Sequence, residues 1–316
     1  MRIVFFGSGA FGEPTLRWLD GSDVEIAHVI TQPPRPSGRG RRLAQTPIGV
    51  LCRELELPAS EVEDVNDASV IDQVRATGAQ LGIVVAFGQF LAAELLSALP
   101  AGFINLHASL LPKYRGAAPI NWAIVRGEQR TGCTVFRVVR RMDAGPILTS
   151  RFTEVKPEET AGELHDRLAR VGVDAVQATL KLFAEGAIPQ GAPQDDAQAT
   201  FAPKLRKSDG VLDFDRPAKE AADLICGMSP WPGAAVRYQA ANGQWERVTL
   251  VRARVAEDPS KPDVPPGTID GRRYVAAWDR YVQVLEIKPT SGRCMTWREY
   301  VNGRHVAEGD VLVRGE

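Results

Sequence analysis

Paired cysteines, long apolar runs and an excess of either charge are all missing from this sequence. Only 4 of its 316 residues are cysteine. Cys52, Cys133, Cys226 and Cys294 lie far apart in the chain, without the spacing of a zinc site or a compact disulfide framework. We therefore expect four reduced cysteines that pack inside the protein, and no metal site.

Apolar runs are all shorter than the roughly 20 residues that a helix needs to cross a bilayer. The first residues, Met1 to Gly7, lack the apolar stretch and cleavage site of a secretory signal. The net charge is −1, so only a local basic patch could attract nucleic acid. The sequence predicts a cytoplasmic protein without a membrane partner.

Short β-branched runs do occur, and they alternate with helical patterns through the first half of the chain. The predicted strands are Ile3–Phe6, Ile26–Ile30, Leu81–Ala86, Phe103–Leu106, 134–139 and 147–152, and the predicted helices are Phe11–Leu19, Ile48–Leu55, Val70–Ala76 and Ala161–Ala184. Strands that are apolar on both faces are typical of a parallel sheet covered by helices. This half therefore predicts a Rossmann-like α/β domain with a mostly parallel sheet.

The length favours two domains. We place the first at residues 1–186, a polar and Gln-rich linker at 187–207, and the second domain at 208–316. After a helical pattern at Ala218–Cys226, the strand candidates are Ala234–Tyr238, Arg247–Ala256, Gly267–Ile269, Tyr274–Ala277 and Val282–Lys288. Short strands separated by Gly, Pro and Asp predict a small β-barrel, of the OB type.

The first glycine motif, Gly7-Ser8-Gly9-Ala10-Phe11-Gly12, matches the G-x-G-x-x-G pattern of dinucleotide-binding folds. That pattern also needs an acidic residue at the end of the next strand, to hold the ribose. Here that strand ends Thr31-Gln32-Pro33, without a carboxylate. The motif therefore favours a tight packing turn, and an NAD-dependent oxidoreductase remains an alternative of another class.

Two polar residues end the strand that begins at Phe103. Asn105 and His107 are two positions apart, so an extended chain points both side chains to one face. Ligands of open α/β sheets bind at the carboxyl ends of the strands. An amide and an imidazole in that place are candidate catalytic groups, although Asn-x-His alone is more typical of a loop cap and a core histidine.

The residues that follow carry a resemblance. The runs Ser109-Leu110-Leu111-Pro112-Lys113-Tyr114-Arg115-Gly116 and Met142-Asp143-Ala144-Gly145-Pro146-Ile147 resemble the folate-dependent formyltransferase family. In that family, Asn-x-His-x-Ser-Leu-Leu-Pro is followed by an aspartate just before a Gly-x-Ile/Met-Leu strand. The resemblance implies Asn105, His107 and Asp143 as the catalytic residues and 10-formyltetrahydrofolate as the formyl donor.

The resemblance also implies a role for each of these catalytic residues and a place for the folate. Attack of an amine on a formyl carbon places negative charge on oxygen, which the Asn105 amide would stabilise, and releases a proton, which His107 would accept. An ionised Asp143 would hold His107 in the useful tautomer, directly or through water. The folate would bind beside Ser109, Leu110, Leu111 and Pro112 and near Val85, Ala86, Phe87 and Gly88, with its pterin held largely by backbone groups.

An arginine-rich stretch from Thr31 to Arg42 indicates the acceptor. It resembles the tRNA-recognition loop of methionyl-tRNA formyltransferases, with Arg39 central and Arg35, Arg41 and Arg42 beside it; Lys204, Arg206 and Lys207 form a second basic cluster. The resemblance implies methionyl-initiator tRNA as partner, a tRNA-binding second domain and a monomer. An amino-sugar formyltransferase with the same donor and a non-catalytic RNA-binding protein remain alternatives.

Overall fold

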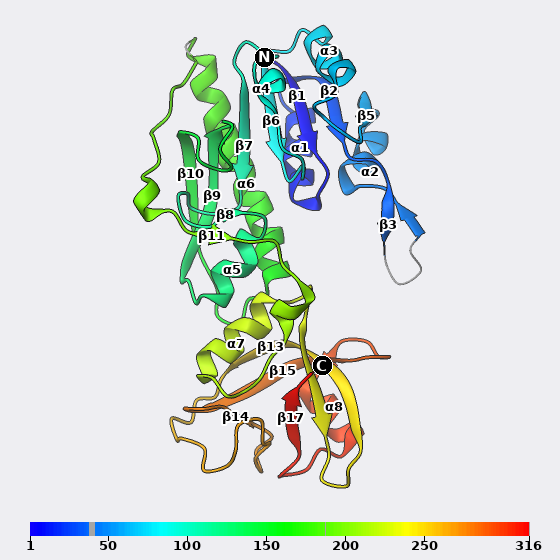
Figure 1. The fold of residues 1–316 in the computed structure, drawn as a ribbon, viewed down its shortest axis with the longest axis vertical. Helices are drawn as coiled ribbons and strands as arrows, with labels where there is room; N and C mark the ends of the chain where they lie inside the picture. Colours follow the sequence, from blue (N-terminus) through cyan, green and yellow to red (C-terminus); the bar gives the residue numbers. More distant parts are fainter. Residues whose placement is uncertain (38–41, 187, 316) are drawn as a thin grey trace. The chain divides into compact units, whose positions relative to one another are not determined.

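The computed structural model describes residues 1–37, 42–186 and 188–315, and the chain divides into two compact units (Figure 1). The first unit comprises Met1–Gly116, Gly132–Thr153 and His165–Phe201, and the second comprises Ala117–Thr131, Glu154–Leu164 and Ala202–Glu316. The chain therefore passes between the units several times, so that helix α6 (Ala161–Ala184) contributes residues to both.

A seven-stranded sheet is the centre of the first unit. Its strands, in spatial order, are β10 (Ile147–Glu154), β9 (Arg130–Arg137), β7 (Phe103–His107), β6 (Leu81–Val85), β1 (Arg2–Gly7), β2 (Glu25–Thr31) and β5 (Ala59–Glu61). The five strands from β7 to β5 pair in parallel, whereas β9 runs antiparallel to β7. All of β6 is buried, as expected for a strand covered on both faces. The prediction of a Rossmann-like, mostly parallel domain is confirmed.

Helices and short pieces complete this unit. They are a 3-10 turn (Ala10–Gly12), α1 (Glu13–Asp20), the hairpin β3 (Arg35–Ser37) and β4 (Arg42–Ala44), α2 (Pro47–Glu54), α3 (Ala68–Ala76), α4 (Ala93–Leu96), β8 (Arg115–Gly116) and a 3-10 turn at Asp196–Gln198. Helix α2 begins where its sequence demands, because Thr46 accepts the Gly49 N–H and Pro47 occupies the first turn. Phe6 packs edge-on against Phe87 and Phe103 in the core.

The second unit is a nearly closed antiparallel barrel. Its strands are β12 (Ala234–Gln239), β13 (Trp245–Val255), β14 (Val275–Ala276), β15 (Tyr281–Pro289), β16 (Met295–Thr296) and β17 (Val311–Arg314), in the order β14-β15-β13-β12-β17 with β16 beside β15. The other elements are α5 (Pro119–Val125), β11 (Phe201–Ala202), a 3-10 turn (Lys207–Gly210), α7 (Ala218–Gly227) and α8 (Trp297–Arg304). The predicted small barrel is confirmed, although Gly267–Ile269 forms only isolated bridges.

Three of the four cysteines pack as expected. Cys52, Cys133 and Cys226 are buried free thiols, and burial raises the pKa of Cys133 to about 12. Cys294 is exposed, so the expectation that it packs inside is wrong. Within the described ranges, no helix has the length and apolar character that crossing a membrane requires.

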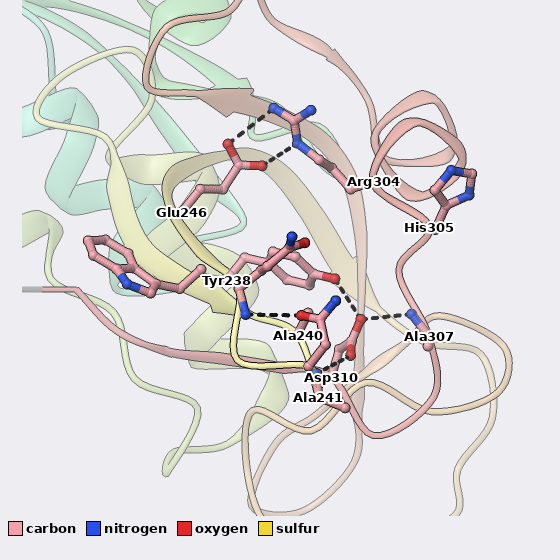
Figure 2. Close-up of a pocket in the computed structure, with 11 residues that line it drawn as sticks. Tyr238, Ala240, Ala241, Glu246, Arg304, His305, Ala307 and Asp310 are labelled. Atoms are coloured by element: carbon pink, nitrogen blue, oxygen red, sulfur yellow. Dashed lines mark hydrogen bonds and ion pairs between the residues drawn. The ribbon is translucent and has the colours of Figure 1, made fainter.

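A buried carboxylate beside a pocket of the second unit accepts hydrogen bonds from three residues of that unit (Figure 2). Asp310 is only 2% exposed. It accepts hydrogen bonds from the Tyr238 hydroxyl at 2.6 Å, the Ala241 N–H at 2.9 Å and the Ala307 N–H at 2.8 Å. Burial acts to raise the pKa of Asp310, but these three hydrogen bonds and the positive charge of Arg273 outweigh it, so the pKa lies below its ordinary value.

Replacing this carboxylate should destabilise the second unit. In Asp310→Asn, the Asn amide group faces three donors, so we expect a loss of about 1–3 kcal/mol in the free energy of unfolding at pH 7. Because the native pKa is lowered, the carboxylate stabilises the fold above its unfolded pKa of about 3.9, and this stability is lost as the pH falls. Urea unfolding at several pH values measures the difference, with exposed Asp215→Asn as control. A gap between wild type and Asp310→Asn that widens toward low pH would contradict this account.

Candidate active site

The candidate site lies at one edge of the first unit's sheet. Strands β6 and β7 are parallel neighbours, with Val85 paired to Leu106, so both end at the same edge. The segments 85–88 and 109–112 therefore leave the sheet side by side. This is the edge at which open α/β sheets bind ligands, because loops diverge there.

His107 is the best-defined group of the site. Its side chain is 8% exposed, and Nε2 lies 2.9 Å from the Tyr114 carbonyl oxygen. Because a carbonyl only accepts, Nε2 must carry a proton, and a neutral imidazole then keeps its lone pair on Nδ1. Nδ1 lies 3.8 Å from Asp143 Oδ2. That separation is too long for a direct hydrogen bond, so the Tyr114 carbonyl is the direct partner that sets the tautomer. The expected contact of Asp143 through water stays a prediction.

Asp143 is held by backbone groups. Its Oδ2 accepts the Gly116 N–H at 2.7 Å, and its own backbone has a φ of +49°. Two residues on, a Cβ at Gly145 would lie 1.7 Å from the Arg137 carbonyl oxygen, so only glycine fits there. The turn therefore brings a carboxylate close to His107 although the two residues lie on different strand ends.

Asn105 lies on β7, two positions before His107 and hence on the same face. The residue is partly exposed. Among the residues that the structure describes, its amide has no hydrogen-bond partner. An amide with open donors at this edge can bind a developing oxyanion.

The turn after β7 is fixed by its own polar groups. Ser109 is fully buried, and its hydroxyl donates to the Lys113 carbonyl at 2.6 Å. Thr134, a residue that no sequence motif marks, donates to the Ser109 carbonyl at 2.7 Å and accepts the Leu111 N–H at 3.1 Å. The Leu111–Pro112 peptide is cis. Ser109 thus shapes this turn, and Leu110 and Pro112 are its partly exposed members.

The neighbouring segment after β6 offers mainly backbone to a ligand. Val85 and Phe87 are buried, whereas Ala86 and Gly88 are exposed. The Ala86 carbonyl accepts the N–H groups of Ser8 and Gly9 at 3.2 and 3.0 Å. These two N–H groups of the first glycine motif therefore bind within the protein, in agreement with its interpretation as a packing turn.

The basic residues fall into two groups. Arg35 and Arg42 are exposed on the hairpin β3–β4, in which Ser37 pairs with Arg42. Arg39 and Arg41, predicted as tRNA contacts, lie outside the described residues. The second group, Lys204, Arg206 and Lys207, is exposed in the second unit. Across the part of the chain that the structure describes, no cluster of three His, Cys, Asp or Glu side chains could hold a metal ion.

Solved structures of other proteins share this fold. A sugar 3N-formyltransferase, WlaRD, matches with a TM-score of 0.65 at 13% identity, covering 93% of this chain and 99% of its own. HypX from Aquifex aeolicus, solved in complex with tetrahydrofolic acid, matches with a TM-score of 0.61 at 16% identity, over 98% of this chain and 48% of that one. At these identities the likeness concerns the fold alone.

Sequence comparison is more specific. The profile of the formyl transferase family matches residues 1–180, and that of the formyl transferase C-terminal domain matches residues 204–305. Methionyl-tRNA formyltransferase of Moorella thermoacetica is 38% identical over 99% of both chains. That of Solibacter usitatus is 37% identical over 100% of this chain and 99% of its own. The alternative of an NAD-dependent oxidoreductase is thereby set aside, and the chain belongs to the methionyl-tRNA formyltransferases of the formyl transferase family.

Proposed function

We propose that this protein transfers the formyl group of 10-formyltetrahydrofolate to the α-amino group of methionyl-initiator tRNA. The observation that carries the chemistry is the site at the end of β7, where the open Nδ1 of His107 lies 3.8 Å from the Asp143 carboxylate. The acceptor is supported by relatives that carry the methionyl-tRNA formyltransferase name over the full length of the chain.

The geometry suits formyl transfer. As the amino nitrogen attacks the formyl carbon, its proton passes to Nδ1 of His107, the nitrogen that the Tyr114 contact leaves free. The formyl oxygen becomes an oxyanion, which the Asn105 amide stabilises by donation. The bond from carbon to the folate nitrogen then breaks, and the proton moves from the imidazolium to that leaving nitrogen. An ionised Asp143 stabilises the transient positive charge on His107.

The remaining sites follow from this assignment. The folate lies along the backbone of residues 85–88 and 109–112, at the edge shared by β6 and β7. The tRNA is bound by the arginines of the β3–β4 region, Arg35, Arg39, Arg41 and Arg42, and by Lys204, Arg206 and Lys207. In this scheme residues 1–186 form the catalytic domain, 187–207 a linker and 208–316 the tRNA-binding domain. The protein acts as a cytoplasmic monomer without a metal.

Removing the catalytic side chains should lower the rate without unfolding the protein. We expect Asn105→Ala to reduce kcat/KM about 10²–10³-fold by loss of an oxyanion donor. We expect His107→Ala to reduce it about 10²–10⁴-fold by loss of the proton acceptor. The assay measures N-formylmethionine released from methionyl-initiator tRNA. Asn302→Ala, an exposed change on α8, is the control, and near-wild-type rates in both site variants would refute the assignment.

Neutralising the hairpin should affect tRNA and spare the folate. In Arg42→Ala we expect weaker tRNA binding and a salt dependence of log affinity that is less steep by about 1, because one phosphate contact is lost. The KM for 10-formyltetrahydrofolate should stay unchanged. Arg53→Ala, exposed on α2 of the same unit, is the matched control. Equal salt slopes in Arg42→Ala and Arg53→Ala would count against the hairpin as a tRNA contact, and formylation of a nucleotide-linked amino sugar in place of tRNA would favour the sugar enzyme.

A further inference from the structure

Part of the segment interpreted as a linker forms hydrogen bonds with the backbone of the candidate active site. Gln194 lies in this segment and is partly buried within the first unit. Its amide nitrogen, Nε2, donates to the carbonyl oxygens of Asp143 and Gly145, each at 2.8 Å. One side chain therefore holds the backbone at the carboxylate-bearing residue and again two residues later.

Gln194 is itself held in a fixed orientation. Arg115 is 3% exposed, and its Nε and Nη2 donate to Gln194 Oε1 at 3.0 and 2.7 Å. A guanidinium group only donates, so it selects the oxygen end of the Gln194 amide. The nitrogen end must then face the two carbonyls. Arg115 also pairs with Asp196 at 2.9 Å, which ties the guanidinium to the same segment.

The turn that Gln194 holds needs such support. Arg140, Arg141 and Met142, which precede Asp143, are exposed and pack little against the core. Asp143 itself has a φ of +49°, a backbone conformation that costs free energy for a residue with a Cβ. Its side chain is held at the other end by the Gly116 N–H. Two backbone hydrogen bonds also hold this turn, from the Ala144 N–H to the Arg141 carbonyl at 3.3 Å and from the Arg137 N–H to the Pro146 carbonyl at 3.0 Å. The Gln194 amide adds the bonds to the carbonyls of Asp143 and Gly145 themselves.

The same segment also reaches the partner of His107. Thr200 Oγ1 accepts the Tyr114 N–H at 2.9 Å, and the Thr200 carbonyl accepts the Arg115 N–H at 2.9 Å. Tyr114 supplies the carbonyl that binds His107 Nε2. Residues 194–200 therefore contact the backbone of Asp143 and also the backbone of Tyr114, whose carbonyl binds His107.

We propose that Gln194 is a positioning residue for formyl transfer, oriented by Arg115 so that its amide holds the Asp143 carboxylate at its distance from His107. The proposal rests on the proposed function, because it acts through Asp143. It assigns to the segment after residue 186 a part in the chemistry in addition to that of a connection.

The decisive variant is Gln194→Glu. A glutamate keeps an oxygen for Arg115 and gains an ion pair, but it cannot donate to the Asp143 and Gly145 carbonyls. If the donation matters, kcat for formyl transfer should fall by about one to two orders of magnitude, because small displacements of catalytic groups are costly. The KM values for folate and tRNA should change little, and Tm should stay close to that of the wild type. Gln194→Ala should lose kcat in the same way.

The controls separate this proposal from the function itself. Gln198→Ala removes an exposed amide of the same segment, which bonds to Asp195 Oδ2 at 2.8 Å, and should keep wild-type kcat. In an Asp143→Ala background, Gln194→Glu should cost little further, because both changes act on one group. Wild-type kcat in Gln194→Glu, an undiminished effect in that background, or unfolding of the variant at the assay temperature would each overturn the proposal. Absence of formyl transfer in the wild type would instead overturn the proposed function.

Discussion

The hydrogen bond from His107 Nε2 to the Tyr114 carbonyl determines what this site can do. It spans 2.9 Å in a buried setting and fixes which ring nitrogen carries the proton. The opposite nitrogen is thereby left as a base that faces the Asp143 carboxylate. If Nδ1 carried the proton in the neutral ring, it could not accept one from an incoming amine. In the proposed mechanism, the backbone around Tyr114 is therefore as important as the side chains beside it.

That backbone is unusual at three places around the site. Ala86, Tyr114 and Asp143 have φ values of +45°, +61° and +49°, which disfavour residues with a Cβ. Such conformations persist where surrounding contacts outweigh their cost, and they cluster at functional sites. Each of the three residues has such a contact. The Ala86 carbonyl accepts two N–H groups, the Tyr114 N–H donates to Thr200, and the Asp143 carboxylate accepts the Gly116 N–H. The hydrogen bonds from distant segments thus hold three turns in shapes that their own residues would avoid.

The sequence was informative where local physics decides the outcome. The strand of residues 81–85 is apolar throughout, so its place inside a parallel sheet followed from composition. The glycine motif could be set aside because a second required residue was missing. By contrast, Gln194 lies among polar residues without periodicity, and its partners are set by tertiary packing. Helix α8 is not among the predicted helices, although Thr296 and Glu299 form a capping box, which is a sequence signal for a helix start.

The glycine motif shows why a shared fold does not settle a function. In a dinucleotide-binding enzyme, the N–H groups after the first strand bind a pyrophosphate. Here the N–H groups of Ser8 and Gly9 donate to the Ala86 carbonyl, at the end of the adjacent strand β6. A Cβ at Gly9 would lie 3.2 Å from the Ala86 Cβ, so glycine permits this close approach. The motif that binds a cofactor in other proteins here binds the Ala86 carbonyl. The candidate active site lies at the edge where the next two strands, β6 and β7, end.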